Sequence, residues 1–362
     1  MIAIESLSVS LGRFAMRDLS LTIGDGEYLV LLGPTGTGKT VLLESLLGLH
    51  RPDGGSIAID GTDVTSLPPE RRNLGYVPQD AALFPHMTVE GNLAYGLRAR
   101  RMDRAETDAR VADMMRLLRI GYLAGRMPHG LSAGERQRVA LGRALAPKPP
   151  VCLLDEPLSA LNESLRIELG RELARIQRET RATFVHICHS FDEASELADR
   201  VVLLCDGSVV QVGTVADLLD RPASEFVARF TCTRNLLPGC ASPAPEGSVV
   251  ALDAGPRVVS SDRAEGRVVV AIRPEHVTVA DGGADGAAGV DGPNVWPGLV
   301  VSIQVRSSCV QMELDIGAPL IVHTPRSSAD GLPPVGATAR VSVPPSAVRL
   351  VPEVGTASGG TA

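Results

Sequence analysis

The hydrophobic pattern of the first 231 residues alternates short apolar runs with amphipathic stretches. The apolar runs have the length of strands and include β-branched residues, as buried parallel strands do: 27–32, 151–154, 182–187 and 201–204. Asp206-Gly207 separates the apolar runs 201–205 and 208–212 and is a hairpin signal. This alternation predicts an α/β domain over residues 1–231.

Two stretches of this first part have helical character. Leucine, isoleucine and alanine recur at helical spacing over 163–179, which predicts an amphipathic helix. Residues 98–118 are rich in arginine, methionine and leucine and carry no strand signal. We therefore predict an inserted helical region there, with its charges on a solvated face.

Beyond residue 231 the chain changes to short β-type runs broken by glycine, proline and serine. Two pairs of segments resemble each other: 235–239 with 294–298, and 268–277 with 339–348. We predict two copies of a small barrel-like β module within 232–354. The stretch 281–293 is then the linker between the copies, and residues 355–362 are predicted to be disordered.

Composition limits the class of protein. A chain of 362 residues, 44% of them hydrophobic, is long enough for about two domains. The net charge of -7 provides no basic face of the kind that nucleic-acid binders present, so no nucleic acid partner is expected. No run approaches ~18 apolar residues and no signal-peptide pattern opens the chain, which predicts a soluble, intracellular protein without lipid insertion. Six cysteines without a C-x-x-C pair predict buried free thiols.

Lysine occurs only at positions 39 and 148, and Lys39 completes a phosphate-binding loop. The pattern G-x-x-x-x-G-K-[ST] is formed by Gly33, Pro34, Thr35, Gly36, Thr37, Gly38, Lys39 and Thr40. An ammonium on a thin stem bridges β- and γ-phosphates in a way that arginine's planar fork does not. The apolar run before the loop predicts a strand, and 41–47 predicts a helix closed by Gly48. Thr40 is placed to ligate Mg²⁺. Lys148 is expected on a surface loop.

Two carboxylates end the apolar run 151–154. Asp155 lies where folds of this kind hold Mg²⁺, and Glu156 is positioned to orient and polarise an attacking water. In isolation the pair would be a strand ending in solvated acids. A P-loop in the same domain favours the catalytic interpretation.

A further helix opens within residues 131–138. The Ser132 hydroxyl and the Gly134 amide at its start form a second anion site, usable for a γ-phosphate. Ser132 is also a good N-cap, with Glu135 completing a capping box. One geometry serves both roles.

With these motifs the chain resembles the ATP-binding subunits of ABC transporters over essentially its whole length. Residues 131–135 match the family signature, which kinases and GTPases lack. The resemblance implies that ATP is the nucleotide, that Gln79 senses Mg²⁺ and the water, and that His189 contacts the γ-phosphate. Without the resemblance, a lone histidine after a strand would be an ordinary polar residue.

The same resemblance implies a fold and an assembly. The fold is a P-loop NTPase of the α/β class, a RecA-like core with a helical subdomain at about 82–146, followed by a small all-β barrel-like domain. The assembly is a head-to-tail homodimer. In each of its two sites ATP lies between Lys39, Thr40, Asp155 and Gln79 of one copy and Ser132 and Gly134 of the other.

Some positions remain open or depart from the family pattern. Phe14 is the candidate aromatic for stacking on adenine, with Leu11 or Ser10 as alternatives. The signature has Ala133 where glycine is usual and Glu135 where glutamine is common. The stretch 159–162 ends in asparagine where the family has aspartate, at the expected dimer interface. Loss of that charge is expected to weaken coupling between the two sites.

Residues 33–97 are particularly similar to the ATPases of molybdate/tungstate-type importers, and 272–275 resembles a TOBE-like oligonucleotide/oligosaccharide-fold regulatory module. This implies import of molybdate, tungstate or a related oxyanion. The chain would work with integral membrane permease subunits at the cytoplasmic face of the cell membrane and, indirectly, with an extracytoplasmic substrate-binding protein. The surface 79–96 would transmit motion to the permease.

Alternatives stay open at this stage. Sulfate, iron, polyamines and sugars are carried by relatives that share much of the pattern. A soluble ABC ATPase of DNA repair or translation is a rival, although neither a second cassette nor a long coiled-coil insertion is visible. The tail could also bind a regulatory oxyanion through Arg306, Ser307 and Ser308, which are otherwise residues of an exposed β-loop.

Overall fold

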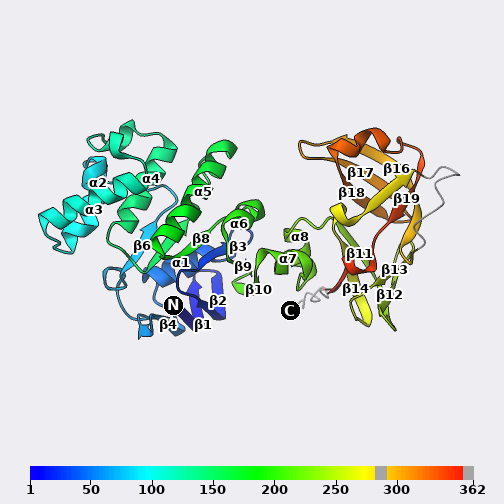
Figure 1. Cartoon of the computed structure of the whole chain (residues 1–362). Helices are drawn as coiled ribbons and strands as arrows, with labels where there is room; N and C mark the ends of the chain where they lie inside the picture. The colour runs from blue at the N-terminus through cyan, green and yellow to red at the C-terminus, as the bar shows by residue number, and fades with distance from the viewer. Residues whose placement is uncertain (282–291, 354–362) are drawn as a thin grey trace. The chain divides into compact units, whose positions relative to one another are not determined.

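Two compact structural units make up the chain, and the division between them falls between Val215 and Ala216 (Figure 1). The computed structural model describes residues 1–281 and 292–353. The linker predicted over 281–293 therefore lies almost entirely outside the described residues. The tail predicted to be disordered lies wholly outside them. The sequence-based domain bounds, with a boundary near residue 231, stay a prediction.

A six-stranded sheet forms the centre of the first unit. Its order is β10-β9-β3-β8-β7-β6, with parallel pairing from β9 to β6 and an antiparallel β10 beside β9. The strands are β3 (Tyr28–Leu32), β6 (Leu74–Val77), β7 (Val151–Asp155), β8 (Thr183–Ile187), β9 (Arg200–Cys205) and β10 (Ser208–Gly213). Every residue of β3, β7 and β8 is buried, which explains their unbroken apolar runs. The strands predicted from these runs are confirmed.

The turn between β9 and β10 is the predicted hairpin. Asp206 has φ 47° and Gly207 has φ 74°, and two positive φ values are what a type I′ turn requires. A Cβ at Gly207 would also lie 2.3 Å from the carbonyl oxygen of Ala15. Glycine is therefore needed there for both conformation and space.

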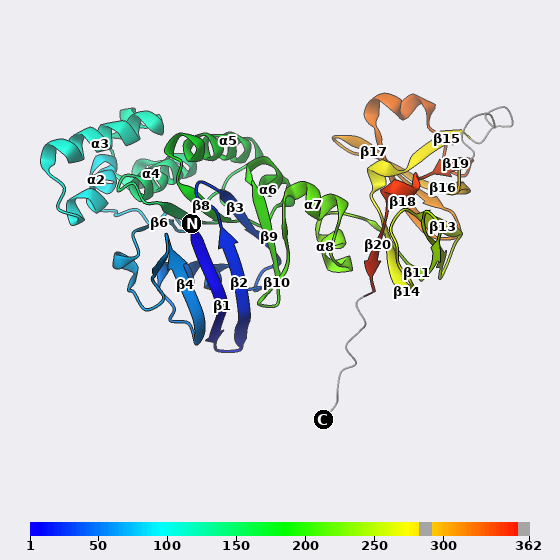
Figure 2. The same ribbon diagram turned by 60° about the horizontal axis from the view of Figure 1, so that its bottom comes forward.

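A second, antiparallel sheet completes the core of this unit. Its order is β2-β1-β4-β5, and β1, β2 and β4 lie side by side in Figure 2. The strands are β1 (Ile2–Leu11), β2 (Phe14–Ile23), β4 (Gly54–Ile59) and β5 (Thr62–Asp63). Their buried residues join those of β3, β7 and β8 in one hydrophobic cluster with helix α1.

The helices of the first unit form two sets. Beside the sheets are α1 (Lys39–Leu47), α5 (Glu163–Thr180) and α6 (Phe191–Leu197). The helices α2 (Val89–Ala99) and α3 (Arg104–Leu117) form a separate group with α4 (Ala133–Leu145), which also contacts β6. The predicted helical region 98–118 is present but broken. Arg101 has φ 59°, and Asp103 caps a new helix by accepting from the amides of Ala105 and Glu106. Short 3₁₀ turns occur at Pro69–Arg71, Gly121–Leu123, Pro128–Gly130, Pro274–His276, Arg326–Gly331 and Pro345–Ala347.

One buried arginine fastens the end of α1. The Arg72 guanidinium, 3% exposed, donates to four backbone carbonyls, those of Ser45 (2.7 Å), Leu46 (2.8 Å), Thr65 (2.9 Å) and Leu67 (2.9 Å). Two of these carbonyls belong to the last turn of α1, where helix carbonyls lack the usual amide four residues on, and that of Ser45 also accepts from the Gly48 amide at 3.1 Å.

We expect Arg72→Leu to lower the free energy of unfolding by about 3 kcal/mol, because it leaves buried carbonyls without donors. Denaturant titration of the full chain measures this. The neighbouring Arg71→Leu, at an exposed position, is the control and should change the free energy by less than about 0.5 kcal/mol. Equal effects of the two substitutions would contradict the role assigned to Arg72.

Two five-stranded antiparallel sheets build the second unit, after the short helices α7 (Val215–Asp220) and α8 (Glu225–Phe230). The first has the order β13-β12-β11-β14-β20 and the second β15-β19-β16-β17-β18. The strands are β11 (Asn235–Ala244), β12 (Gly247–Leu252), β13 (Arg257–Ser260), β14 (Gly266–Ile272), β15 (Thr278–Asp281), β16 (Val295–Val305), β17 (Cys309–Asp315), β18 (Pro319–Pro325), β19 (Thr338–Ser342) and β20 (Val348–Pro352). Their inward residues form one shared core.

The two halves of this unit exchange strands. β15 follows the first sheet in sequence but pairs with β19 of the second, while β20 ends the chain's second half but pairs with β14 of the first. Two buried asparagines also join the two sheets. Asn235 exchanges two hydrogen bonds with the backbone of Ile321 (2.6 and 2.8 Å), and Asn294 does the same with Val259 (both 2.7 Å). Each asparagine is buried and reaches a strand of the other sheet.

All six cysteines are free thiols, as predicted, but only Cys152 and Cys188 are buried. Cys205 and Cys309 are half-buried. Burial was the wrong prediction for Cys232 and Cys240, which are exposed. Cys240 occupies an outward position in the alternation of β11, and Cys232 lies in the connection before that strand. Among the described residues, no helix has the length and apolarity needed to cross a membrane.

Candidate active site

The loop Gly33–Thr40 joins the end of β3 to α1, as the sequence predicts, and α1 ends at Gly48 in a left-handed conformation. Gly38 has φ 96°, and a Cβ there would lie 2.2 Å from the ring of Phe14. The Lys39 ammonium, 4% exposed, donates to the carbonyls of Gly33 and Pro34, both at 2.8 Å. Burial lowers the pKa of Lys39, and the nearby Glu156 carboxylate opposes that effect.

The same loop leaves its outer surface open. Pro34, Thr35, Gly36 and Thr40 are exposed, whereas Thr37 is buried with its hydroxyl donating to the Pro34 carbonyl at 3.0 Å. A Cβ at Gly36 would meet no atom within 4 Å. The exposed backbone of the loop lies at the start of α1, with the Lys39 ammonium beside it. This arrangement fits a polyphosphate chain.

Asp155 and Glu156 stand at the end of β7, next to this loop. Burial raises the pKa of the Asp155 carboxyl, and the charge of Glu156 adds to the rise, while His189 and Lys39 counteract it. Glu156 has φ 46°, a left-handed conformation that is uncommon for a residue with a side chain. Its amide donates to the Ile187 carbonyl at 3.0 Å, which ties the bend to β8.

Three side chains predicted to act together meet at Glu156. The Gln79 amide donates to one carboxylate oxygen at 3.1 Å, and the His189 Nε2 contacts the other. Gln79 follows β6, Glu156 follows β7 and His189 follows β8, and these strands are parallel neighbours. The carboxyl ends of parallel strands share one edge of the sheet, which explains why residues 77 and 33 positions away meet at one carboxylate.

The signature segment begins α4 as a complete capping box. Ser132 Oγ accepts from the Glu135 amide at 3.3 Å, and the Glu135 carboxylate accepts from the Ser132 amide at 2.7 Å. The Tyr122 hydroxyl donates to the other Glu135 oxygen at 3.0 Å. These hydrogen bonds lower the pKa of Glu135, with the Ser132 amide as the main cause. Among the described residues, no hydrogen bond or ion pair joins Ser132 or Gly134 to the P-loop.

Phe14 opens β2, and its ring lies against Gly38 of the P-loop. The alternatives named from the sequence are nearby, since Leu11 pairs with Phe14 and Ser10 with Ala15 in the same hairpin. Phe14 is half-buried, while Ser10 and Leu11 are exposed. Adenine stacking by Phe14 remains a prediction.

Sequence reasoning missed the residues that hold the segment after Gln79. The buried Asn92 side chain accepts from the Phe84 amide (2.8 Å) and donates to three carbonyls of residues 84–88. Arg143 of α4 donates to the carbonyls of Ala81 and Ala82, and its guanidinium lies 5.1 Å from the centre of the Phe84 ring. The sequence offered only a weak signal, an asparagine among the apolar residues of 89–97, where no individual helix was predicted.

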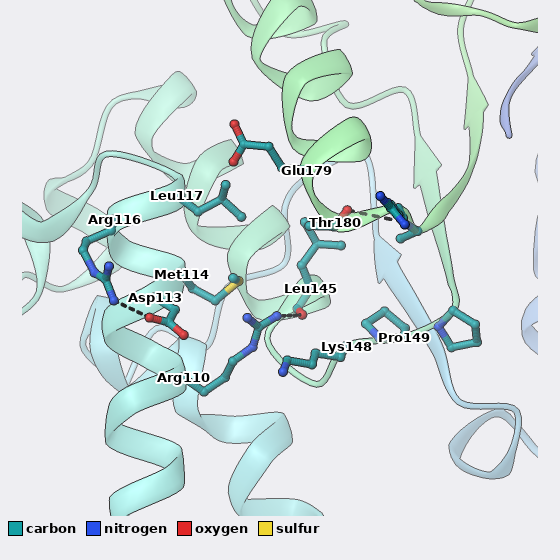
Figure 3. A pocket seen from close by; sticks show the side chains of 13 residues that line it. Arg110, Asp113, Met114, Arg116, Leu117, Leu145, Lys148, Pro149, Glu179 and Thr180 are labelled. Atoms are coloured by element: carbon teal, nitrogen blue, oxygen red, sulfur yellow. Dashed lines mark hydrogen bonds and ion pairs between the residues drawn. The ribbon is translucent and has the colours of Figure 1, made fainter. Parts of the chain in front are cut away.

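A cavity of about 650 Å³ lies away from these residues, between α3, the end of α4 and the end of α5 (Figure 3). Pro150 and Ala182, which directly precede β7 and β8, line it, so it lies at the opposite edge of the sheet from the P-loop. Its Arg110 donates to the carbonyls of Leu145 (3.0 Å) and Ala146 (2.8 Å) at the end of α4. The Arg110 guanidinium therefore caps the C-terminal end of α4. Lys148, on the same wall, is an exposed loop residue, as expected.

A P-loop beside a strand that ends in paired carboxylates defines a class, the P-loop nucleoside triphosphatases. Comparison with known families narrows this class. Residues 16–159 match the family described as ABC transporter, and residues 270–351 match the TOBE domain.

Three curated relatives each match 75% or more of the chain. The molybdate/tungstate import ATP-binding protein WtpC of Pyrococcus horikoshii is 40% identical over 321 residues, which cover 89% of this chain and 90% of that protein. WtpC of Thermococcus kodakarensis is 42% identical over 77% of this chain and 83% of its own length. The spermidine/putrescine import ATP-binding protein PotA of Methylococcus capsulatus is 44% identical over 75% of this chain and 71% of its own length.

Among solved structures, the ATP-binding cassette MJ0796, described as a dimer in a post-hydrolysis state bound to ADP and Pi, matches with a TM-score of 0.53 and 26% identity. The match covers 59% of this chain and 99% of that one. The chain belongs to the ABC transporter ATPase family, whose members bind and hydrolyse ATP. The predicted fold class and ATPase activity are confirmed.

Proposed function

We propose that the chain is the ATP-hydrolysing subunit of an importer for molybdate, tungstate or a related oxyanion. The observation that carries the ATPase part is the meeting of Gln79 and His189 at Glu156, next to the loop that holds Lys39. Support for the oxyanion comes from the WtpC relatives, whose similarity includes most of the second unit.

In this proposal the site takes ATP with Mg²⁺. The loop Gly33–Thr40 holds the phosphates, and the Phe14 ring stacks on adenine. Thr40, Gln79 and Asp155 offer a hydroxyl, an amide oxygen and a carboxylate, the hard oxygen donors that Mg²⁺ prefers. The bound ion supplies positive charge to the phosphates. Glu156 orients and polarises the attacking water. His189, which contacts the Glu156 carboxylate, faces the γ-phosphate.

Removal of divalent ions tests the metal assignment. With EDTA in excess, phosphate release by the full chain is expected to fall to background, because the negative charge on the transferred phosphate is no longer neutralised. Added Mg²⁺ should restore the rate. Hydrolysis that continues unchanged in EDTA would contradict the roles of Thr40 and Asp155 as metal ligands.

The assembly proposed is a head-to-tail homodimer. Ser132 and Gly134 lie at the start of α4, where Ser132 and Glu135 form a capping box. Within the part of the chain that the structure describes, neither Ser132 nor Gly134 has a hydrogen bond with the P-loop of the same chain. A second copy would bring them to the ATP. This complements the solved cassette, which is described as a dimer. The Asn162 side chain caps α5 by accepting from the Leu165 amide at 3.0 Å, so the departure from aspartate keeps the cap and loses only the charge.

Partners and location follow from the family. The chain would bind integral membrane permease subunits from the cytoplasmic face, without entering the lipid, and would serve an extracytoplasmic binding protein indirectly. The surface 79–96 is the proposed contact. It includes Tyr95 of α2, 45% exposed, whose ring lies 4.4 Å from that of Phe84 in the loop that follows Gln79. Motion at Gln79 would therefore reach the permease.

Polyamine import is the second candidate. PotA of Methylococcus capsulatus is 44% identical to this chain over 275 residues, a shorter span than the 321 residues that match WtpC of Pyrococcus horikoshii. Deletion of the gene in its own cells separates the two. We expect cellular molybdenum and tungsten to fall, with rescue by the wild-type chain and not by Glu156→Gln. Loss of spermidine uptake with unchanged metal content would overturn the oxyanion assignment.

Regulation through the tail is also open. Arg306, Ser307 and Ser308 form the exposed turn between β16 and β17, and the Arg306 side chain donates to Gln304 at 2.8 Å. Titration of the full chain with molybdate, tungstate and sulfate tests them as oxyanion contacts. An absence of binding heat for all three oxyanions would dismiss that role.

A further inference from the structure

A buried polar cluster joins β3, β8 and α6, close to the proposed active site. His186, in the middle of β8, has no exposed surface. Its Nδ1 lies 3.0 Å from the hydroxyl of Tyr28. Its Nε2 lies 3.1 Å from a carboxylate oxygen of Glu193, within ion-pair distance but without hydrogen-bond geometry, so this buried nitrogen has no hydrogen-bond partner among the described residues. The Tyr28 ring is buried too, and Glu193 has 11% of its side chain exposed. Tyrosine, histidine and glutamate thus form a continuous chain inside the first unit.

The two ends of the segment that carries His189 are joined by this cluster. His186 belongs to the strand that leads into the segment, and Glu193 belongs to the first turn of α6, which leads out of it. His189 lies between them, three residues after one and four before the other. The contact between His186 and Glu193 therefore closes a short loop, and closure of so few residues leaves little freedom to those inside.

Other bonds fix the inside of the same loop. Ser190 caps α6 by accepting from the Glu193 amide at 3.3 Å, and the Cys188 thiol donates to the Ser190 carbonyl at 3.4 Å. The Cys188 amide donates to the Leu31 carbonyl of β3 at 3.3 Å. Tyr28, at the start of that strand, supplies the third attachment, so the loop is tied to the strand that runs into the P-loop.

A histidine at this place is costly if packing is its only purpose. Every other residue of β8 apart from Thr183 is apolar, and a buried polar group must be satisfied before it stabilises anything. Well-packed apolar residues often equal or exceed buried charged pairs in stability. Buried polar groups do, however, restrict the arrangements open to their neighbours, here through the Nδ1 hydrogen bond with Tyr28 and the close approach of Nε2 to the Glu193 carboxylate.

We propose that His186 is a positioning residue: by bridging Tyr28 and Glu193 it holds residues 187–192 closed, so that His189 stays in contact with Glu156. The inference rests on the proposed function only for the consequence in catalysis. The closure itself is a property of the chain without nucleotide.

Two substitutions separate the two contacts of the imidazole. Glutamine can place an amide nitrogen near the Nε2 position and so keep a polar group against the Glu193 carboxylate, whereas asparagine reaches only the Nδ1 position next to Tyr28. His186→Gln should therefore retain the closure that His186→Asn loses. His50→Asn is the control, because His50 contacts Glu44 at 2.8 Å in a partly exposed histidine–glutamate pair that lies outside the segment.

Hydrogen exchange of the full chain without nucleotide is the first measurement. His186→Asn should raise exchange in the peptide 187–193 by about tenfold or more and leave the P-loop peptide unchanged, while His186→Gln stays within about threefold of wild type. ATP hydrolysis is the second. His186→Asn should lower kcat roughly tenfold with the KM for ATP within about twofold, because it misplaces His189 without altering the phosphate loop.

Equal hydrogen exchange of the peptide 187–193 in His186→Asn, His186→Gln and His50→Asn would overturn the proposal. Equal losses of kcat in His186→Asn and His186→Gln would also overturn it. His189→Ala keeps this result distinct from the proposed function. If His189→Ala hydrolyses ATP at the wild-type rate, the assigned role of His189 fails, while the exchange data still decide whether His186 holds the segment closed.

Discussion

Glu156→Gln is expected to lower kcat for ATP hydrolysis by roughly 10²–10³-fold, because the amide cannot polarise water as the carboxylate does. ATP binding should persist, since Lys39 and its loop remain intact. The substitution preserves the size of the side chain, so its contacts with Gln79 and His189 retain similar geometry. Steady-state phosphate release and ATP binding to the same preparation measure the two effects separately.

Glu163→Gln is the matched control for that experiment. Glu163 is the first residue of α5, and its carboxylate pairs with Arg166 on the exposed side of that helix. Its kcat should remain within about twofold of wild type, since an exposed ion pair contributes little. Wild-type turnover by Glu156→Gln would show that another group activates the water.

Lys39→Arg is expected to weaken ATP binding by about 100-fold or more. The Lys39 ammonium fits between the carbonyls of Gly33 and Pro34, with 4% of the residue exposed. A guanidinium is planar and larger than an ammonium, so it does not fit the same position without moving the loop. The loop cannot yield easily, because a left-handed Gly38 lies directly against the Phe14 ring.

Lys148→Arg makes the same substitution at the other lysine and should leave ATP affinity unchanged, because Lys148 is an exposed residue at the opposite edge of the sheet. Nucleotide titration followed by calorimetry provides both values. If Lys39→Arg binds ATP as tightly as wild type, the geometric argument for lysine is wrong.

Local patterns were sufficient to predict the parts of the site that are continuous in sequence. The P-loop, the strand before it and the helix after it depend on residues within about twenty positions, so spacing and polarity reveal them. The pair Asp155 and Glu156 followed from the same logic. The meeting of Gln79 and His189 at Glu156 did not, because strand order in a parallel sheet depends on long-range packing. The resemblance to a family implied that both residues act at the ATP site, but not that they contact Glu156.

The residues that were missed share a physical cause. Arg72 serves carbonyls 5 to 27 positions away, and its sequence neighbour Arg71 is exposed, so nothing local distinguishes them. His186 is polar within an apolar strand, a visible signal, but its partners come from β3 and α6. The exchange of β15 and β20 between the two sheets was likewise not predicted, because it too depends on partners distant in sequence.

The most direct test of the account asks whether each ATP site is shared between two copies. Lys39→Ala removes the phosphate loop's ammonium, and Ser132→Asp keeps the N-cap of α4 while placing negative charge where a phosphate would bind. Each variant alone should be inactive. In a mixed dimer, the Ser132→Asp copy supplies the intact loop and the Lys39→Ala copy supplies the intact signature.

The measurement is ATP hydrolysis by an equimolar mixture of the two variants. If half of the dimers are mixed and each holds one intact site, the mixture should recover roughly a quarter of wild-type activity, as a head-to-tail pair of equivalent sites requires. Activity no higher than the average of the separate variants would contradict a shared site and place the whole reaction within one chain.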